Sequence, residues 1–308
     1  MESAPCSSMR AMAAAMTFSL FSSGLSFLGG RPHFFIWLAS FVENIFRTRS
    51  ISIDIIYCPV YNCNIEQVLY IAKEARKMKI ELWSDYACPF CYIGEKRLEK
   101  ALAEIDGGDK VEIEFKSFEL DPYASREVVS STVDRFAAKY HLSKEEAAER
   151  IEAISRMGRS EGIDFRYVST RYTNTFDSLR LTKYAQEKGK TGVITKLFDA
   201  YFTKNLKLSD HDVLTQIAGE CGLDKDEVTA VLSGDRYADE VRADEQEAME
   251  HGIHGVPYFL INGKYTASGA QPTAMLKKAI EKILAEETSA ATSLDGMVCG
   301  ADGCHFAQ

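Results

Sequence analysis

Two cysteines, Cys88 and Cys91, stand three residues apart in the sequence Cys88-Pro89-Phe90-Cys91. Proline suits the first turn of a helix, where it leaves no amide unpaired, so we predict a helix that begins at Pro89. Cys88 then lies at the helix N-terminus, where free amides and the helix dipole favour a thiolate. Cys91 lies one turn further on, close enough to attack a mixed disulfide on Cys88. The spacing therefore predicts dithiol–disulfide exchange, with Cys88 and Cys91 as catalytic residues.

Other interpretations of this pair stay open. A CxxC pair is also half of a zinc site, whose other half would be Cys299 and Cys304. Their CX4C spacing in a polar tail suits zinc poorly, so we predict no metal site. An inert structural disulfide is the third interpretation, although the start of a helix is a costly place for one. Cys299 and Cys304 flank two Gly and one Asp, so they are either a second redox pair or two idle thiols.

The elements around Cys88 follow from the hydrophobic pattern. Residues Lys79–Ser84 and Val111–Phe118 alternate as strands, and the apolar stripe between them ends near Ile105. A CxxC after the first strand of such a βαβ unit is typical of a thioredoxin-type redox site. From about residue 130 to 250 the pattern is helical throughout, and Ser143 with Glu146 forms a capping box.

Strands return near the end of the chain. Residues Pro257–Ile261 and Lys264–Ala267 flank Asn262-Gly263, a strong hairpin signal. A last helix follows Gln271-Pro272. We therefore predict an α/β chain with a thioredoxin-like fold, βαβ…ββα, interrupted by an all-α inserted domain. The predicted parts are residues 78–125 with 250–288 for the first domain, 126–249 for the insertion, and 289–308 for a flexible tail.

Residues 1–77 differ in composition from the rest. They contain seven Lys or Arg against five Asp or Glu, whereas the remainder contains 29 against 40. An uncharged run at 11–28 follows Arg10, as in a targeting segment. Met78 also opens a strand as a natural start would. The extension is therefore a leader upstream of the true start, a targeting or anchoring segment, or an added module.

Composition narrows the class of protein. The chain has 308 residues, is 46% hydrophobic and carries a formal net charge of −9. It is thus globular and lacks the basic face that general nucleic-acid binding requires. The acidic composition and an unpaired Cys221 favour the cytoplasm, with export or membrane anchoring through 11–28 as the alternative. The sequence does not set the oligomeric state.

Several separated motifs share one family resemblance. Trp83–Cys91, WSDYACPFC, resembles the active-site opening of the DsbA family, and is closest to its FrnE-like branch. Three further motifs agree in order: Asn174–Leu181 (NTFDSLRL), His254–Phe259 (HGVPYF) and Gly263–Pro272 (GKYTASGAQP). The resemblance covers about residues 78–288. It departs at Leu179, where a His is expected.

This resemblance implies a cis bond between Val256 and Pro257 that faces the CxxC. The backbone of Val256 would then pair with an extended substrate chain. From the residues alone, Pro257 is equally the first residue of an edge strand. Phe90 and Trp83 are candidate substrate-binding residues, or they merely pack.

Asp85 lies three residues before Cys88. It is a candidate proton relay for the thiols, or it simply ends the strand.

The expected activity is thiol–disulfide exchange with protein substrates and no bound cofactor, with glutathione as a candidate co-substrate. Two alternatives remain. One is a glutathione-dependent isomerase or transferase of the 2-hydroxychromene-2-carboxylate isomerase type, whose members resemble this chain but carry Ser at the position of Cys88. The other is a redox-inactive chaperone that holds peptides on the same fold.

Overall fold

The structure is a computed structural model that describes residues 78–295, 297–300 and 303–306, with side chains described for 78–286. The extension at 1–77 lies outside the described residues. The strands are β1 (Lys79–Ser84), β2 (Glu112–Ser117), β3 (Tyr258–Ile261), β4 (Tyr265–Ser268), β5 (Met297–Gly300) and β6 (Gly303–Phe306). The α-helices are α4 (Pro89–Ala103), α5 (Thr132–Tyr140), α6 (Lys144–Ser160), α7 (Phe176–Glu187), α8 (Gly192–Phe202), α9 (His211–Glu220), α10 (Lys225–Ser233), α11 (Ala238–Glu250) and α12 (Thr273–Asp295). Two short 3-10 helices are η1 (Gly108–Lys110) and η2 (Tyr167–Ser169).

Four strands form one mixed sheet in the order β2-β1-β3-β4. β1 and β2 run parallel, with Ser84 opposite Ser117, and β3 is antiparallel to both β1 and β4. The predicted turn between β3 and β4 is confirmed, because Asn262 and Gly263 both have positive φ, 56° and 66°. Because β1 and β3 are antiparallel, the end of β1 lies beside the start of β3, with Trp83 opposite Tyr258. This brings the segments before α4 and before β3 together.

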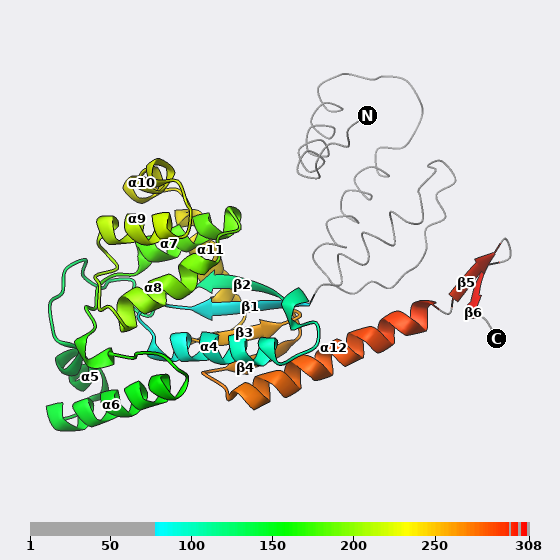
Figure 1. Ribbon diagram of the computed structural model, residues 1–308, viewed down its shortest axis with the longest axis horizontal. Helices are drawn as coiled ribbons and strands as arrows, with labels where there is room; N and C mark the ends of the chain where they lie inside the picture. Colours follow the sequence, from blue (N-terminus) through cyan, green and yellow to red (C-terminus); the bar gives the residue numbers. More distant parts are fainter. Residues whose placement is uncertain (1–77, 296, 301–302, 307–308) are drawn as a thin grey trace, which may run out of the picture. The chain divides into compact units, whose positions relative to one another are not determined.

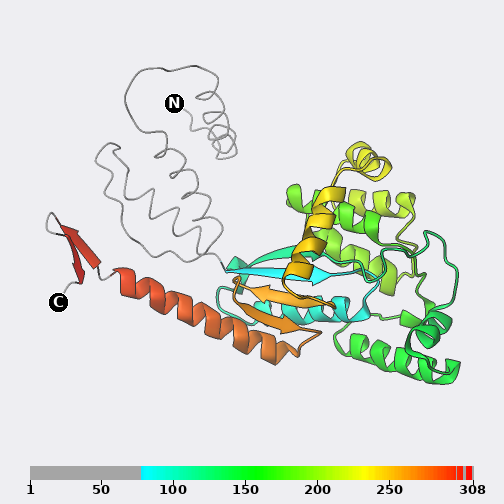
Figure 2. The ribbon, with the colours of Figure 1, turned by 180° about the vertical axis from the view of Figure 1, so that it is seen from behind.

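Helices cover both faces of this sheet. On one face, α4 and α12 pack their apolar residues against Ile80, Leu82 and Phe259 (Figure 1). On the other face, α11 packs against Trp83 and Leu260, and Figure 2 shows α11 in front of the strands. The predicted order βαβ, helical block, ββα is confirmed, and with it the α/β fold class.

The inserted helices share a core with the start of α4. Tyr92 on α4 stacks on Phe198 of α8, with ring centroids 5.1 Å apart and planes 4° apart. The predicted capping box at Ser143 and Glu146 is present at the start of α6. Helix α4 is therefore packed against the insertion as well as against the sheet.

The end of the chain differs from the prediction. We predicted a flexible tail from residue 289, but α12 continues through Asp295, and β5 pairs with β6. Residues 286–295 contain neither Gly nor Pro, and the two Ala, two Glu and one Leu among them favour helix. In this hairpin the backbone register places Cys299 opposite Cys304.

Candidate active site

The two thiols lie where β1 ends and α4 begins. Cys88 is the N-cap residue of α4, with φ −90° and ψ 114°, and Pro89 occupies the first turn. The Cys88 amide donates to the Asp85 carbonyl at 3.0 Å, and the Cys91 amide donates to the Cys88 carbonyl at 3.2 Å. Both are free thiols; Cys88 is 4% exposed and Cys91 0%. Cys88 is thus the sulfur nearer to solvent and nearer to the helix terminus.

The segment before β3 faces Cys88 across a long sequence separation. The Val256–Pro257 peptide bond is cis, and the Cys88 Sγ donates to the Val256 carbonyl at 3.4 Å. Pro257 also packs closely on α4, because a Cβ added at Gly94 would lie 3.1 Å from the Pro257 Cγ. The structure therefore brings together Cys88, Cys91, Val256 and Pro257.

Burial changes the acidity of the Cys91 thiol. Burial raises the pKa of Cys91 well above its usual range, and the hydrogen bond and charge of Cys88 raise it further. The Ser84 hydroxyl and the main chain of Asp85 lower that pKa, with smaller effect. Cys91 therefore holds its proton firmly, as suits a thiol that reacts second.

Asp85 is a buried carboxylate with a full set of donors, and its side chain is 2% exposed. Its Oδ1 accepts from the Ala87 amide at 3.1 Å and the Thr175 hydroxyl at 2.9 Å, and its Oδ2 accepts from the Leu120 amide at 2.8 Å. Burial nevertheless raises its pKa, against the lowering effect of these hydrogen bonds. No hydrogen bond of the described residues joins this carboxylate to either thiol. Its contacts tie the loop between β1 and α4 (residues 85–88, here called the redox loop) to the segment after β2 and to the start of α7.

The prediction that Trp83 lines a substrate groove is wrong. Its side chain is 0% exposed and packs with α11 residues and Leu260 in the core. Its indole Nε1 donates to the Asp244 carbonyl at 3.0 Å. The Trp83 side chain points away from α4 because neighbouring side chains of a strand point to opposite faces of the sheet. Phe90, in contrast, is 37% exposed at the start of α4 and is open to a substrate.

Three of the described residues whose buried side-chain atoms lack a hydrogen-bond partner bear on this site. The hydroxyls of Ser84 and Ser117, neighbours across β1 and β2, are two of them. The third is the Arg135 guanidinium on α5, whose Nε and Nη2 are unpartnered. Sequence reasoning missed Arg135; its signal was the absence of any acid three or four residues away on its helix.

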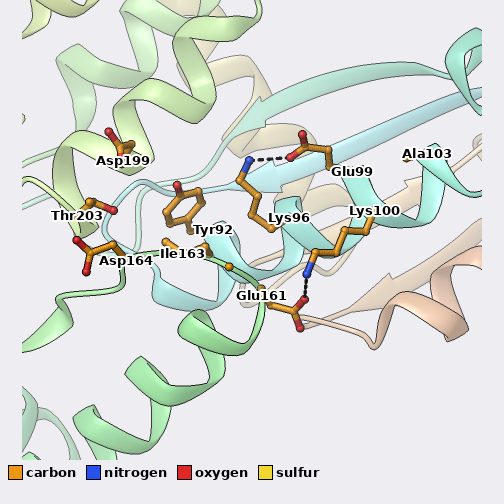
Figure 3. Close-up of a pocket in the computed structure, with 11 residues that line it drawn as sticks. Tyr92, Lys96, Glu99, Lys100, Ala103, Glu161, Ile163, Asp164, Asp199 and Thr203 are labelled. Carbon is orange, nitrogen blue, oxygen red and sulfur yellow. Dashed lines mark hydrogen bonds and ion pairs between the residues drawn. The ribbon is translucent and has the colours of Figure 1, made fainter.

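A hollow of about 500 Å³ lies on the outer side of α4 (Figure 3). It is bordered by Tyr92 and by charged residues that pair with one another, Lys96 with Glu99 and Lys100 with Glu161, at 2.7 Å in each pair. Neither Cys88 nor Cys91 lines it. We therefore take the two thiols, and not this hollow, as the candidate active site.

The described part of the chain lacks two other features, a metal-binding group and a membrane-spanning helix. Within it, no three His, Cys, Asp or Glu side chains gather into a group that could hold a metal ion. No helix there combines the length and the apolar character needed to cross a bilayer.

Comparison with known proteins identifies the family. The DSBA-like thioredoxin domain matches residues 79–281. The chain belongs to the DsbA-like thioredoxin domain family. Its fold is accordingly the thioredoxin-like one that the sequence predicted.

Individual relatives agree with this membership. The uncharacterised protein YwbO of Bacillus subtilis is 30% identical over 204 residues, which cover 65% of this chain and 94% of YwbO. A probable DsbA oxidoreductase from Streptomyces coelicolor is 36% identical with a TM-score of 0.63, covering 75% of this chain and all of that one. A 2-hydroxychromene-2-carboxylate isomerase shares the fold at 14% identity and a TM-score of 0.53, covering 69% of this chain and 98% of the isomerase.

Proposed function

We propose that this DsbA-like protein is a thiol–disulfide oxidoreductase that acts on protein substrates through Cys88 and Cys91. The observation that carries the proposal is the place of Cys88, at the N-cap of α4 with its sulfur on the Val256 carbonyl and Cys91 buried one turn behind it. A helix N-terminus stabilises the thiolate that attacks. The 36% identical Streptomyces protein, described as a probable DsbA oxidoreductase, supports the same chemistry.

The reaction balances with the two cysteines alone. The Cys88 thiolate attacks one sulfur of a substrate disulfide, and a mixed disulfide forms as the other substrate sulfur leaves as a thiolate. Cys91 loses its proton and attacks the Cys88 sulfur, which releases the second substrate thiolate. Two electrons pass from the dithiol to the substrate, and the two protons of the dithiol go to the released thiolates. The same steps in reverse oxidise a substrate dithiol.

Substrate placement follows from the segment before β3. An extended chain lies beside the Val256 main chain, and the exposed Phe90 contacts its side chains. The Cys299–Cys304 pair is proposed as a second redox pair, supported by the register that places the two residues opposite each other. Assignment to the FrnE-like branch, a cytoplasmic location and the division into residues 78–125 with 250–288 and an insertion at 126–249 stay predictions.

Turnover of a protein disulfide tests the proposal. In an insulin reduction assay, Cys88→Ser abolishes activity, and Cys91→Ser accumulates mixed disulfides on Cys88 that mass spectrometry detects. Cys221→Ser is the matched control, because Cys221 is a free thiol at the end of α9, and it retains full activity. Full activity of Cys88→Ser would sink the assignment. Glutathione-dependent isomerisation by the same variant would then favour the isomerase alternative.

A further inference from the structure

Arg135, on α5, is a cation without an acidic partner among the described residues. Its Nε and Nη2 are buried and unpartnered, and none of the ion pairs among residues 78–286 includes it. Two other arginines of the insertion differ in this respect: Arg126 and Arg180 both bind Asp177, at 2.7 and 2.9 Å. Leaving a buried charge unpaired is costly, so an unpartnered guanidinium needs an explanation such as an absent anion.

Tyrosine side chains lie around this guanidinium. Its Cζ lies 3.8 Å from the centre of the Tyr172 ring, which covers one face. The Tyr201 hydroxyl is buried without a partner, and Arg135 lowers its pKa against the stronger raising effect of burial. Arg135 also lowers the pKa of Tyr167, which burial raises to about 12. A guanidinium edge and two phenol hydroxyls therefore meet with no anion among them.

The same tyrosines connect this cluster to the redox loop. The Tyr172 hydroxyl donates to Asp121 Oδ2 at 3.2 Å, and the preceding residue, Leu120, donates its amide to Asp85 at 2.8 Å. Asp85 in turn accepts from the Cys88 amide at 3.0 Å through its carbonyl. Tyr167 also belongs to the same buried apolar cluster as Cys88 and Cys91, and Arg135 acts on its phenol electrostatically.

We propose that Arg135, with Tyr167 and Tyr201, binds the carboxylate of a low-molecular-weight disulfide or thiol that reacts at Cys88. This inference rests on the proposed function. A carboxylate supplies the acceptors that the guanidinium fork and the hydroxyls lack. Because the free Nε and Nη2 are buried, a flexible small molecule reaches them more readily than an acidic side chain of a folded protein. Arg135 is thus a binding residue for one class of substrate and takes no part in protein-disulfide turnover.

The test compares charged and neutral disulfides on the full chain. Oxidation of the reduced protein is followed by thiol quantitation with 3,3′-dithiodipropionate, which carries carboxylates, and with hydroxyethyl disulfide, which is neutral. Arg135→Met slows the reaction of the charged disulfide about 10- to 100-fold, the effect of losing a charge-assisted hydrogen bond, and leaves the neutral one within about twofold. Arg135→Lys gives an intermediate loss. The control Arg156→Met removes an exposed arginine of α6 that pairs with Glu152 at 3.8 Å and changes neither rate.

A second readout needs no redox chemistry. 3,3′-Thiodipropionate, a thioether that cannot exchange disulfides, raises the Tm of the wild-type protein and of Arg156→Met, but not that of Arg135→Met. Equal rate losses on both disulfides, or equal stabilisation of Arg135→Met by the thioether, would overturn the inference. If the wild-type protein does not reduce insulin yet is stabilised by the thioether, the proposed function fails and the carboxylate site stands. If Arg135→Met does not fold, Arg135→Lys carries the same comparison with a smaller expected loss.

Discussion

Two ionisable side chains, the buried Asp85 and the half-buried Arg135, differ in how their polar atoms are partnered. Asp85 receives three donors from three segments, whereas the Nε and Nη2 of Arg135 have no acceptor at all. A buried polar group that is fully partnered holds its surroundings together, and one that is left open costs stability unless something binds it. We infer that Asp85 braces the redox loop and that Arg135 is kept for a ligand.

Removing Asp85 is expected to have the largest effect. Asp85→Ala leaves the amides of Ala87 and Leu120 and the Thr175 hydroxyl without an acceptor, which costs about 2 to 3 kcal/mol of unfolding free energy. Urea unfolding at pH 7 measures it. Arg135→Met, in contrast, removes a group that has no acceptor to lose, and its stability stays within about 1 kcal/mol of the wild type.

Similar losses of unfolding free energy in Asp85→Ala and Arg135→Met would contradict this difference between the two residues. A loss below about 1 kcal/mol for Asp85→Ala would mean that water replaces the carboxylate. A loss of 3 kcal/mol or more for Arg135→Met would be about the cost of breaking a buried ion pair, and would make Arg135 structural.

Glu95 on α4 stands between the two extremes. Its Oε1 accepts from the Thr195 hydroxyl at 2.8 Å, while its Oε2 is buried without a partner. Burial raises its pKa from 4.5 to about 7. The folded state binds this proton more tightly than the unfolded state. The contribution of Glu95 to the free energy of unfolding is therefore full below pH 4.5 and is lost as pH rises through 7.

Glu95→Gln keeps the hydrogen bond and removes the charge. The variant is therefore expected to be more stable than the wild type above pH 7, by about 1 to 3 kcal/mol, with the difference disappearing near pH 4. Urea unfolding at pH 4, 6 and 8 gives the profile. Glu99→Gln, at an exposed acid of the same helix that pairs with Lys96 at 2.7 Å, serves as control and shows no comparable slope. A pH-independent difference for Glu95→Gln would contradict the raised pKa.

The smallest expected effect concerns Ser84. Its hydroxyl is buried without a partner in the resting protein, and it lowers the Cys91 pKa. Ser84→Ala should slow release of substrate from the Cys88 mixed disulfide about three- to tenfold, because the Cys91 thiolate loses a donor, with stability within about 1 kcal/mol. Single-turnover kinetics of mixed-disulfide decay measure the rate. Ser117→Ala removes the neighbouring unpartnered hydroxyl, and unequal rates for the two variants support a specific role for Ser84; equal rates contradict it.

Prediction from the sequence worked best where the signal is local. Residues Lys79–Ser84 form β1 as the alternation predicts, and Ser143 with Glu146 caps α6 as their spacing predicts. The end of α12 was misjudged because a polar composition was taken for a flexible tail. Trp83 was misjudged because a motif beside the cysteines shows that a residue is near them, but not to which face of the strand its side chain points.

The amino-acid sequence was enough to predict the order of the elements, the hairpin at Asn262-Gly263 and the position of Cys88 at the start of a helix. These features depend on contacts within a few residues, and backbone preference and hydrophobic period encode such contacts directly. Packing between distant segments sets the Val256 carbonyl 3.4 Å from the Cys88 sulfur and supplies the donors that surround Asp85. Among the described residues, the same packing gives Arg135 no acidic partner. Each of these features depends on segments that are far apart in the chain. Burial makes every unpartnered polar atom costly there, and no local sequence pattern indicates its partner.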